Sequence, residues 1–207
     1  IPPDIVHPGD GKPKIHAEVH NLYGMLMARA GSAAFERFRP EHRPFVISRS
    51  GFSGLQRYAM HWTGDNSSWW EHLWMSMPQL QNLGLSGLAW AGVDVGGFWG
   101  DTNAELLARW TEFGAFQPFC RNHSAVGTRS QEPWAFGEPY ESVIRDMLKL
   151  RQRLIPYLYT LFDACQRSGA PVLRPLLFEY PDDERTYAAD DQFLLGESLL
   201  IAPITNH

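Results

Sequence analysis

Short apolar segments that alternate with helical segments constrain the fold of this chain more than any other feature. Each apolar segment is bounded by Gly, Pro or polar residues, as buried strands are, and most are followed by residues with apolar positions at helical spacing. This alternation is typical of an α/β protein with a parallel sheet. We expect strands at residues 45–48, 88–93, 171–180 and 198–204, and another short strand within 114–123.

About four such strand and helix units fit into the 207 residues. A (β/α)8 TIM barrel typically takes about 250 residues. The sequence therefore predicts roughly the C-terminal half of a (β/α)8 TIM barrel, with the N-terminal half missing. We expect helices at residues 17–30, from Ser67 or Ser68 to about 83, at 102–113 and at 140–167.

Capping residues and prolines indicate where these helices begin and where they bend. The pairs Ser68 with Glu71 and Thr102 with Glu105 have the spacing of a capping box, in which each side chain bonds to the other residue's backbone N–H. Pro78 is expected to kink or break the first of these helices, and Pro156 to bend the long helix at 140–167.

The composition excludes several classes of protein. Lys and Arg number 18 against 23 Asp and Glu, a net charge of −5, which excludes a basic nucleic-acid-binding surface. All apolar runs are shorter than the roughly 20 residues that a membrane helix needs. The segment IPPDIVHPGDGKPK is no signal peptide, and its start at Ile1 indicates a cut chain. The two cysteines form no CxxC pair, so the compartment stays open, with a soluble cytoplasmic location slightly favoured.

Three motifs resemble cofactor or catalytic sites but lack the required spacing or partners. HAEVH places His16 and His20 on one helix face but differs from HExxH and has no obvious third ligand, so we interpret it as helix packing. GVDVGGFWG matches neither a phosphate loop nor a dinucleotide fingerprint. The segment around Ser53 lacks the spacing of a nucleophile elbow. We therefore expect no metal and no cofactor.

The tryptophans are unevenly distributed, because all eight lie between Trp62 and Trp134. Large aromatic side chains most often fill a core. The alternative is a carbohydrate site, where indole rings cover the apolar faces of sugars. Composition by itself favours the core.

Polar residues follow several of the predicted strands. They are Arg49, Asp65 with Asn66, Asp94, and the run Arg121, Asn122 and His123. In a parallel α/β barrel the catalytic residues gather at the carboxyl ends of the strands, so these segments should meet in one pocket. Each also has a structural alternative. Arg49 and Asp94 could form an ion pair, Asp65 could cap a helix, and His123 could be a buried, hydrogen-bonded histidine.

The motifs HAEVHNLYG, RSGFSGLQRYA, WTGDNSSWWEHL, LSGLAWAGVDVGGF, FCRNHS and QEPW occur in this order. Together they resemble glycoside hydrolase family 31, the α-glucosidase family, from about Ile1 to the end of the chain. The resemblance implies a (β/α)8 barrel that hydrolyses α-glycosidic bonds with retention through two aspartates. It also implies an exo-acting α-glucosidase that releases terminal α-linked glucose from oligosaccharides.

The resemblance further implies roles for individual residues. Asp65 in WTGDN matches the general acid/base of the family. Five residues match substrate-binding positions, and they are Arg49, Trp62, Asp94, Phe98 and His123. Arg49 would contact the sugar and His123 its hydroxyls. Asp94 would be a polar subsite residue, and Phe98 and Trp62 would form aromatic walls.

One departure from the family pattern dominates. The nucleophilic aspartate of the family lies in a WxDMNEP motif, and this chain has no such motif. The resemblance places the missing residue just before the region similar to IPPDIVHPGDG, so the N-terminal half of the barrel would be a required partner. The barrel segment would span residues 1–197, and residues 198–207 would begin a following β-domain.

Two alternatives remain at this point. The parent enzyme could be an α-xylosidase or a transglycosylase, since relatives with these activities share much of the motif set. Alternatively, the chain could be a non-catalytic half-barrel remnant, or a module that binds sugars or a partner.

Overall fold

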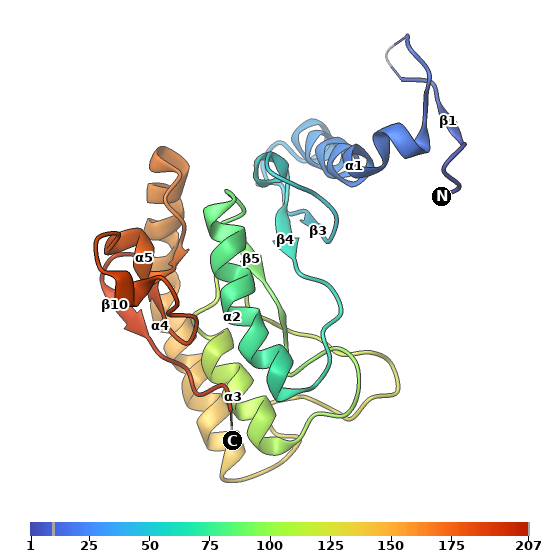
Figure 1. The fold of residues 1–207 in the computed structure, drawn as a ribbon. Coiled ribbons are helices and arrows are strands. Elements are labelled where there is room, and N and C mark those ends of the chain that lie inside the picture. Colours follow the sequence, from blue (N-terminus) through green and yellow to red (C-terminus); the bar gives the residue numbers. More distant parts are fainter. Residues whose placement is uncertain (10, 207) are drawn as a thin grey trace. The chain divides into compact units, whose positions relative to one another are not determined.

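The computed structural model describes residues 1–9 and 11–206. The chain forms two compact units, Ile1–His61 and Trp62–His207, called unit 1 and unit 2 (Figure 1). Among the described residues, no helix combines the length and the apolar character needed to cross a bilayer.

Unit 1 consists of a hairpin, a long helix and a parallel strand pair. Its elements are β1 (Val6–His7), β2 (Lys14–Ile15), α1 (His16–Phe38), β3 (Ile47–Ser48), a 3-10 helix (Leu55–Arg57) and β4 (Met60–Trp62), whose last residue begins unit 2. β1 and β2 are antiparallel, whereas β3 and β4 are parallel. The Glu18 carboxylate accepts the Ile15 N–H at 3.0 Å and so satisfies a free donor at the start of α1.

Unit 2 contains four more helices and six strands among its described residues. They are α2 (Trp70–Leu85), β5 (Ala91–Gly92), β6 (Asp94–Val95), α3 (Ala104–Gly114), β7 (Arg121–Asn122), α4 (Tyr140–Ser168), β8 (Leu173–Arg174), α5 (Leu176–Glu179), a 3-10 helix (Glu184–Thr186), β9 (Phe193–Leu195) and β10 (Leu199–Ile201). β6 and β7 pair in parallel, with Asp94 opposite Arg121. β8, β9 and β10 form an antiparallel sheet.

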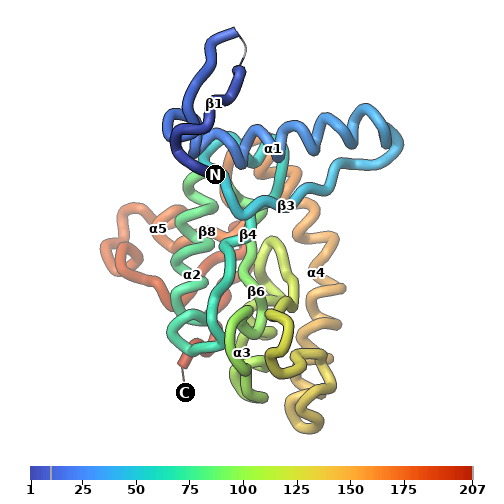
Figure 2. Tube along the Cα trace, turned by 90° about the vertical axis from the view of Figure 1, so that its right-hand side faces the viewer, coloured from blue at the N-terminus to red at the C-terminus, as the bar shows by residue number. Residues whose placement is uncertain are grey.

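The core of unit 2 lies between its helices and its strands. Leu73 and Met77 of α2, one helical turn apart, are fully buried, and so are Trp110 and Phe113 of α3. Residues three or four apart share one helix face, so each helix presents an apolar stripe to the strands. α3 also packs along α4, as Figure 2 shows.

Arg151 of α4 fixes the chain between α3 and β7. Its guanidinium donates to the carbonyl oxygens of Ala115 and Pro118, both at 3.1 Å, and also to that of Gln117. The Gln117 side chain is fully buried and accepts the Val93 N–H at 3.1 Å. One arginine thus holds the segment that leads into β7 and, through Gln117, supports Val93 between β5 and β6.

The structure agrees with the predicted α/β organisation, since parallel pairs and helices alternate through residue 168. The described strands form no closed barrel. The strand expected at 171–180 is mostly wrong, because only Leu173–Arg174 is extended and α5 follows. Pro175 accounts for this boundary, since it has no N–H to continue a strand.

Both predicted capping boxes are wrong. Asn103, not Thr102, caps α3, and its side chain accepts the Leu106 N–H at 2.9 Å. α2 has no side-chain cap at Trp69, because the Ser68 hydroxyl donates instead to the Gly100 carbonyl at 3.2 Å. α2 also continues through Pro78, where buried packing outweighs the lost backbone hydrogen bond.

We expect Arg151→Met to lower the free energy of unfolding of unit 2 by about 2–4 kcal/mol, because it leaves three carbonyl groups without their donor. Urea denaturation followed by tryptophan fluorescence measures this, since all eight tryptophans lie in unit 2. The control is Arg153→Met, two residues along the same helix at an exposed position. Equal destabilisation by both variants would contradict the role of Arg151.

Candidate active site

The loop after β4 carries Asp65 and is tied to the loop after β6. The Asn66 carbonyl oxygen accepts the N–H groups of Phe98 at 2.8 Å and Trp99 at 2.9 Å. The Asn66 side chain donates to the Asp94 carbonyl oxygen at 3.3 Å. These bonds hold the residue next to Asp65 against the backbone that carries Phe98.

Gly97 allows the two loops to approach each other closely. A Cβ at this position would lie 2.5 Å from the backbone N and Cα of Ser68, and its φ of +88° is one that residues with side chains rarely adopt. The Ser68 N–H donates to the Trp99 carbonyl at 2.8 Å, and Ser67 and Trp99 form a parallel bridge. We call this contact between residues 64–68 and 96–100 the loop clasp.

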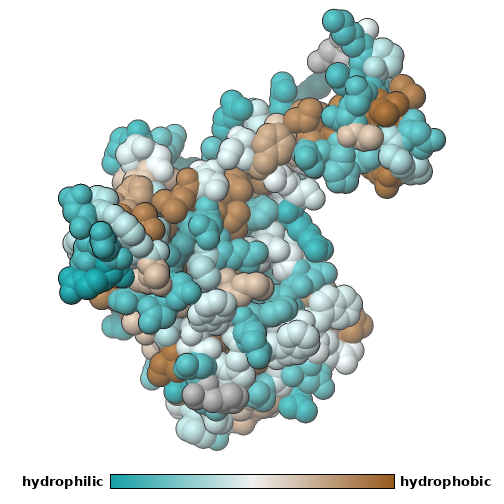
Figure 3. All heavy atoms as spheres, in the orientation of Figure 1, coloured by the Kyte–Doolittle hydropathy of each residue, from teal (hydrophilic) through white to brown (hydrophobic). Residues whose placement is uncertain are grey.

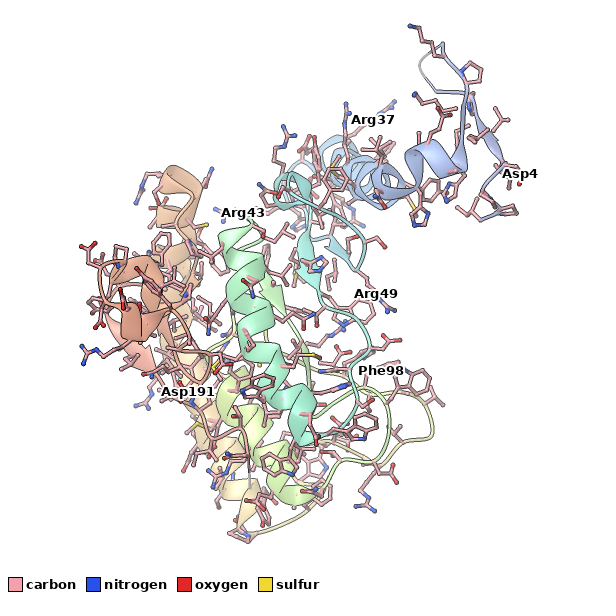
Figure 4. All side chains as sticks on the ribbon, viewed as in Figure 1. Asp4, Arg37, Arg43, Arg49, Phe98 and Asp191 are labelled. Atoms are coloured by element: carbon pink, nitrogen blue, oxygen red, sulfur yellow. The ribbon has the colours of Figure 1, made fainter. Side chains whose placement is uncertain are left out.

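Three aromatic rings lie beside the clasp, and the His123 ring contacts the other two. The rings of Phe98 and His123 are 5.0 Å apart and inclined by 31°, and those of Trp62 and His123 are 6.2 Å apart in a T-shaped arrangement. Figure 4 labels Phe98 on the loop that follows β6. The Ala125 N–H donates to the Phe98 carbonyl at 2.9 Å, which fixes the segment after His123 to the same loop. The flat rings of Trp62 and Phe98 therefore both lie against the imidazole of His123.

Asp94 neighbours Trp62 and His123 of this group and is fully buried. Its Oδ1 accepts a hydrogen bond from Arg121 Nη2 at 2.6 Å, an ion pair set up by the register of β6 and β7. Burial raises the pKa of the Asp94 carboxyl, whereas Arg121, the Trp62 indole and His123 oppose this and lower it. The Arg121 guanidinium also lies over the Trp62 ring, 5.0 Å from its centroid.

Gln131 braces the loop clasp from a third segment. Its side chain is buried and donates to the Gly97 carbonyl at 2.8 Å, while its backbone carbonyl accepts the Asn122 side-chain N–H at 2.5 Å. A Cβ at Gly96 would lie 2.2 Å from Gln131 Oε1. Gln131 therefore connects Asn122 of β7 with Gly97 of the clasp.

Arg49 belongs to unit 1, where it is exposed and borders a cavity of about 780 Å³ (Figure 4). His16 and His20 line the same cavity. His16 Nδ1 lies 3.0 Å from His7 Nε2, and His16 Nε2 lies 3.1 Å from His20 Nδ1. Burial, together with the neighbouring His20 and His7, lowers the pKa of His16.

These three histidines form a chain of contacts and do not converge on one point. Among the described residues, no three His, Cys, Asp or Glu side chains are arranged to hold a metal ion. The sequence drew attention to His16 and His20 but missed His7, which only the β1 and β2 hairpin brings to them.

Residues 3–161 match the family model described as the glycosyl hydrolases family 31 TIM-barrel domain, and residues 169–207 match the family 31 C-terminal domain. This chain belongs to glycosyl hydrolase family 31. The resemblance of the six motifs is thereby confirmed at the family level.

Named relatives of this family 31 chain are α-glucosidases. It is 56% identical to Alpha-glucosidase 2 of Bacillus thermoamyloliquefaciens over 200 residues, which is 97% of this chain and 25% of that protein. It is 46% identical to Neutral alpha-glucosidase C of Mus musculus, over 97% of this chain and 22% of that one. The chain therefore spans about a quarter of the length of these relatives.

Solved family 31 structures share the fold. The glucosidase II alpha subunit in its Glc1Man2-bound form has a TM-score of 0.95 and 39% identity, covering 100% of this chain and 22% of that one. The Flavobacterium johnsoniae dextranase complexed with glucose has a TM-score of 0.88 and 35% identity, covering 93% of this chain and 25% of that one.

The structure brings Trp62, Asp94, Phe98 and His123 together in unit 2, next to the loop of Asp65. Sequence reasoning noticed Arg121 only as a polar residue after a strand and gave it no role. The signal that could have identified it is its place two residues before His123, in the segment 114–123 where a short strand was expected.

We expect Gly97→Ala to destabilise unit 2 more than Gly100→Ala does. Both glycines have positive φ, +88° and +83°, but a Cβ at Gly100 meets nothing within 4 Å. Gly100→Ala should therefore cost only the conformational penalty of about 1–2 kcal/mol, and Gly97→Ala about 1–3 kcal/mol more, from the clash with Ser68. Urea denaturation of the two variants, followed by tryptophan fluorescence, tests this, and equal losses would show that the close approach is not required.

Proposed function

We propose that this chain is part of the catalytic barrel of a retaining α-glucosidase, in which Asp65 acts as general acid/base on terminal α-linked glucose of oligosaccharides. The observation that carries the proposal is the loop clasp, which holds the Asp65 loop beside the aromatic group of Trp62, Phe98 and His123. The α-glucosidase names of the relatives support the reaction.

The reaction requires two carboxyl groups. Retaining hydrolysis places them about 5–5.5 Å apart, one to attack the anomeric carbon and one to protonate the leaving oxygen. In the proposal Asp65 is the second, and after glycosylation it takes a proton from the incoming water. The first carboxyl, the nucleophile, comes from a part of the barrel outside residues 1–207.

The remaining residues would recognise the sugar. The guanidinium of Arg49 offers several fixed donors to hydroxyl groups, and His123 can donate or accept. The rings of Trp62 and Phe98 provide flat apolar surfaces for the C–H faces of a pyranose. Asp94 is buried beside Arg121 and supports this set of residues from behind.

A chimera tests the acid role. The matching segment of the Bacillus thermoamyloliquefaciens α-glucosidase, 56% identical, would be replaced by this chain. We expect the chimera to hydrolyse maltose and Asp65→Asn to lower kcat by about 10²–10⁴-fold, because the alkoxide leaving group then departs without a proton. An aryl α-glucoside with an acidic phenol needs little protonation and should lose much less in its first step, measured as the burst of phenol.

The control for the chimera is Asp146→Asn, an exposed carboxylate of α4, which should leave both substrates unaffected. Azide attacks without a general base, so it should speed turnover of the aryl substrate in Asp65→Asn. Equal losses on both substrates, with no effect of azide, would refute the acid/base role.

The rest of the barrel would cover apolar surface that unit 1 exposes. Several large apolar side chains of α1 lie at the surface, as Figure 3 shows, and they are Leu22, Leu26, Met27, Phe35 and Phe38. Surface of this kind promotes association when it has no partner.

We expect the chain by itself to self-associate in sedimentation velocity experiments. Met27 is 62% exposed, so Met27→Glu should weaken the association by removing apolar surface. Arg29→Gln makes the same change in net charge without removing an apolar side chain and serves as the control. A monomeric chain at all concentrations would contradict the proposal that α1 packs against a missing part.

A further inference from the structure

The ion pair of Asp94 and Arg121 lies where burial disfavours a charged carboxylate. The Asp94 residue is fully buried, and its Oδ1 lies 2.6 Å from Arg121 Nη2. Removing a carboxylate from water is strongly unfavourable unless partners compensate. Its Oδ2 is buried, and hydrogen bonding from the Trp62 indole lowers the pKa of this carboxyl.

Arg121 connects this carboxylate to the aromatic group. Its guanidinium lies 5.0 Å from the centroid of Trp62 and 5.7 Å from that of Phe119, within the range of cation–π attraction. Trp62 in turn makes a T-shaped contact with His123. A chain of contacts therefore runs from Asp94 through Arg121 and Trp62 to His123.

We propose that Asp94 and Arg121 are a positioning pair, which orients the Trp62 indole and supports His123 while Asp94 itself never contacts the sugar. This inference rests on the proposed function, because that function gives Trp62 and His123 their roles in sugar binding. The contacts between Asp94 and Arg121 are independent of it. A carboxyl that is 0% exposed offers no surface to a ligand. Its effect on catalysis has to pass through Arg121 and Trp62.

The charged and titratable groups that face Asp94 come from two elements. Arg121 lies on β7 and His123 directly after it, and the Trp62 indole at the end of β4 adds a neutral donor. Protonation of Asp94 removes the charge that Arg121 and the indole both face. The indole N–H of Trp62 should therefore report the ionisation of Asp94.

The first experiment follows the Trp62 indole resonance in ¹H–¹⁵N spectra of the 207-residue chain as a function of pH. In the wild type it should shift with the protonation of Asp94, and Asp94→Asn should abolish the shift. Arg121→Gln should move its midpoint to higher pH, because loss of the cation raises the pKa of Asp94 further. The control is Arg109→Gln, which removes the ion pair with Glu112 on α3 and should change neither result.

The second experiment is a double-mutant cycle in the active chimera. We expect Asp94→Asn and Arg121→Gln each to lower kcat/KM at least tenfold, and the double variant to lose no more than the worse single variant, as for residues that act as a unit. Arg121→Lys, which keeps the charge, should recover part of the loss even if Asp94→Asn folds poorly. Direct contact of Asp94 with the sugar predicts additive losses instead.

The two experiments separate the possible failures. An inactive chimera with a Trp62 resonance that follows Asp94 contradicts the proposed function and leaves the pair established. A Trp62 resonance independent of Asp94, or additive losses in the cycle, overturns the positioning role.

Discussion

The close approach of two backbone segments, residues 64–68 and 96–100, is the constraint on which the rest of the site depends. It requires a residue without a side chain at Gly97, because Ser68 occupies the space that a Cβ would take. Once the segments meet, Asn66 holds the backbone of Phe98 and Trp99, and the Ser68 N–H is satisfied by Trp99. The place of Asp65 follows from bonds made by its neighbours along the chain.

Burial divides the site into a supporting layer and a contact layer. Asp94 and Gln131 are almost completely inaccessible, and their side chains bond to Arg121 and to the Gly97 carbonyl. Trp62 and His123 are only partly buried. In a low-dielectric interior the electrostatic interactions and hydrogen bonds of a buried charge with its neighbours are stronger than in water. The supporting layer can therefore fix ring orientations that loops in water would leave variable.

Local sequence pattern predicted those parts of the fold that depend on local chemistry. The helix expected at 140–167 is α4, and Asp65 and His123 follow strands as predicted, whereas Asp94 is the first residue of β6. The functional roles of these residues stay predictions. The sequence pattern did not predict features that depend on contacts between residues far apart in the chain. The Ser68 hydroxyl donates to Gly100 instead of capping α2, and the ion partner of Asp94 depends on strand register. No local signal in one sequence records either contact.

The loop clasp, the ion pair and the aromatic group all lie within unit 2, whereas the proposed nucleophile lies outside the chain. The two halves of double displacement make different demands, since the nucleophile must reach the anomeric carbon and the acid must reach the leaving oxygen. If one compact unit organises the acid side, substitutions in its supporting layer should impair leaving-group protonation before they impair attack. Poor leaving groups would then be more sensitive than good ones to changes at Gly97 or Gln131, although neither residue carries a proton in the reaction.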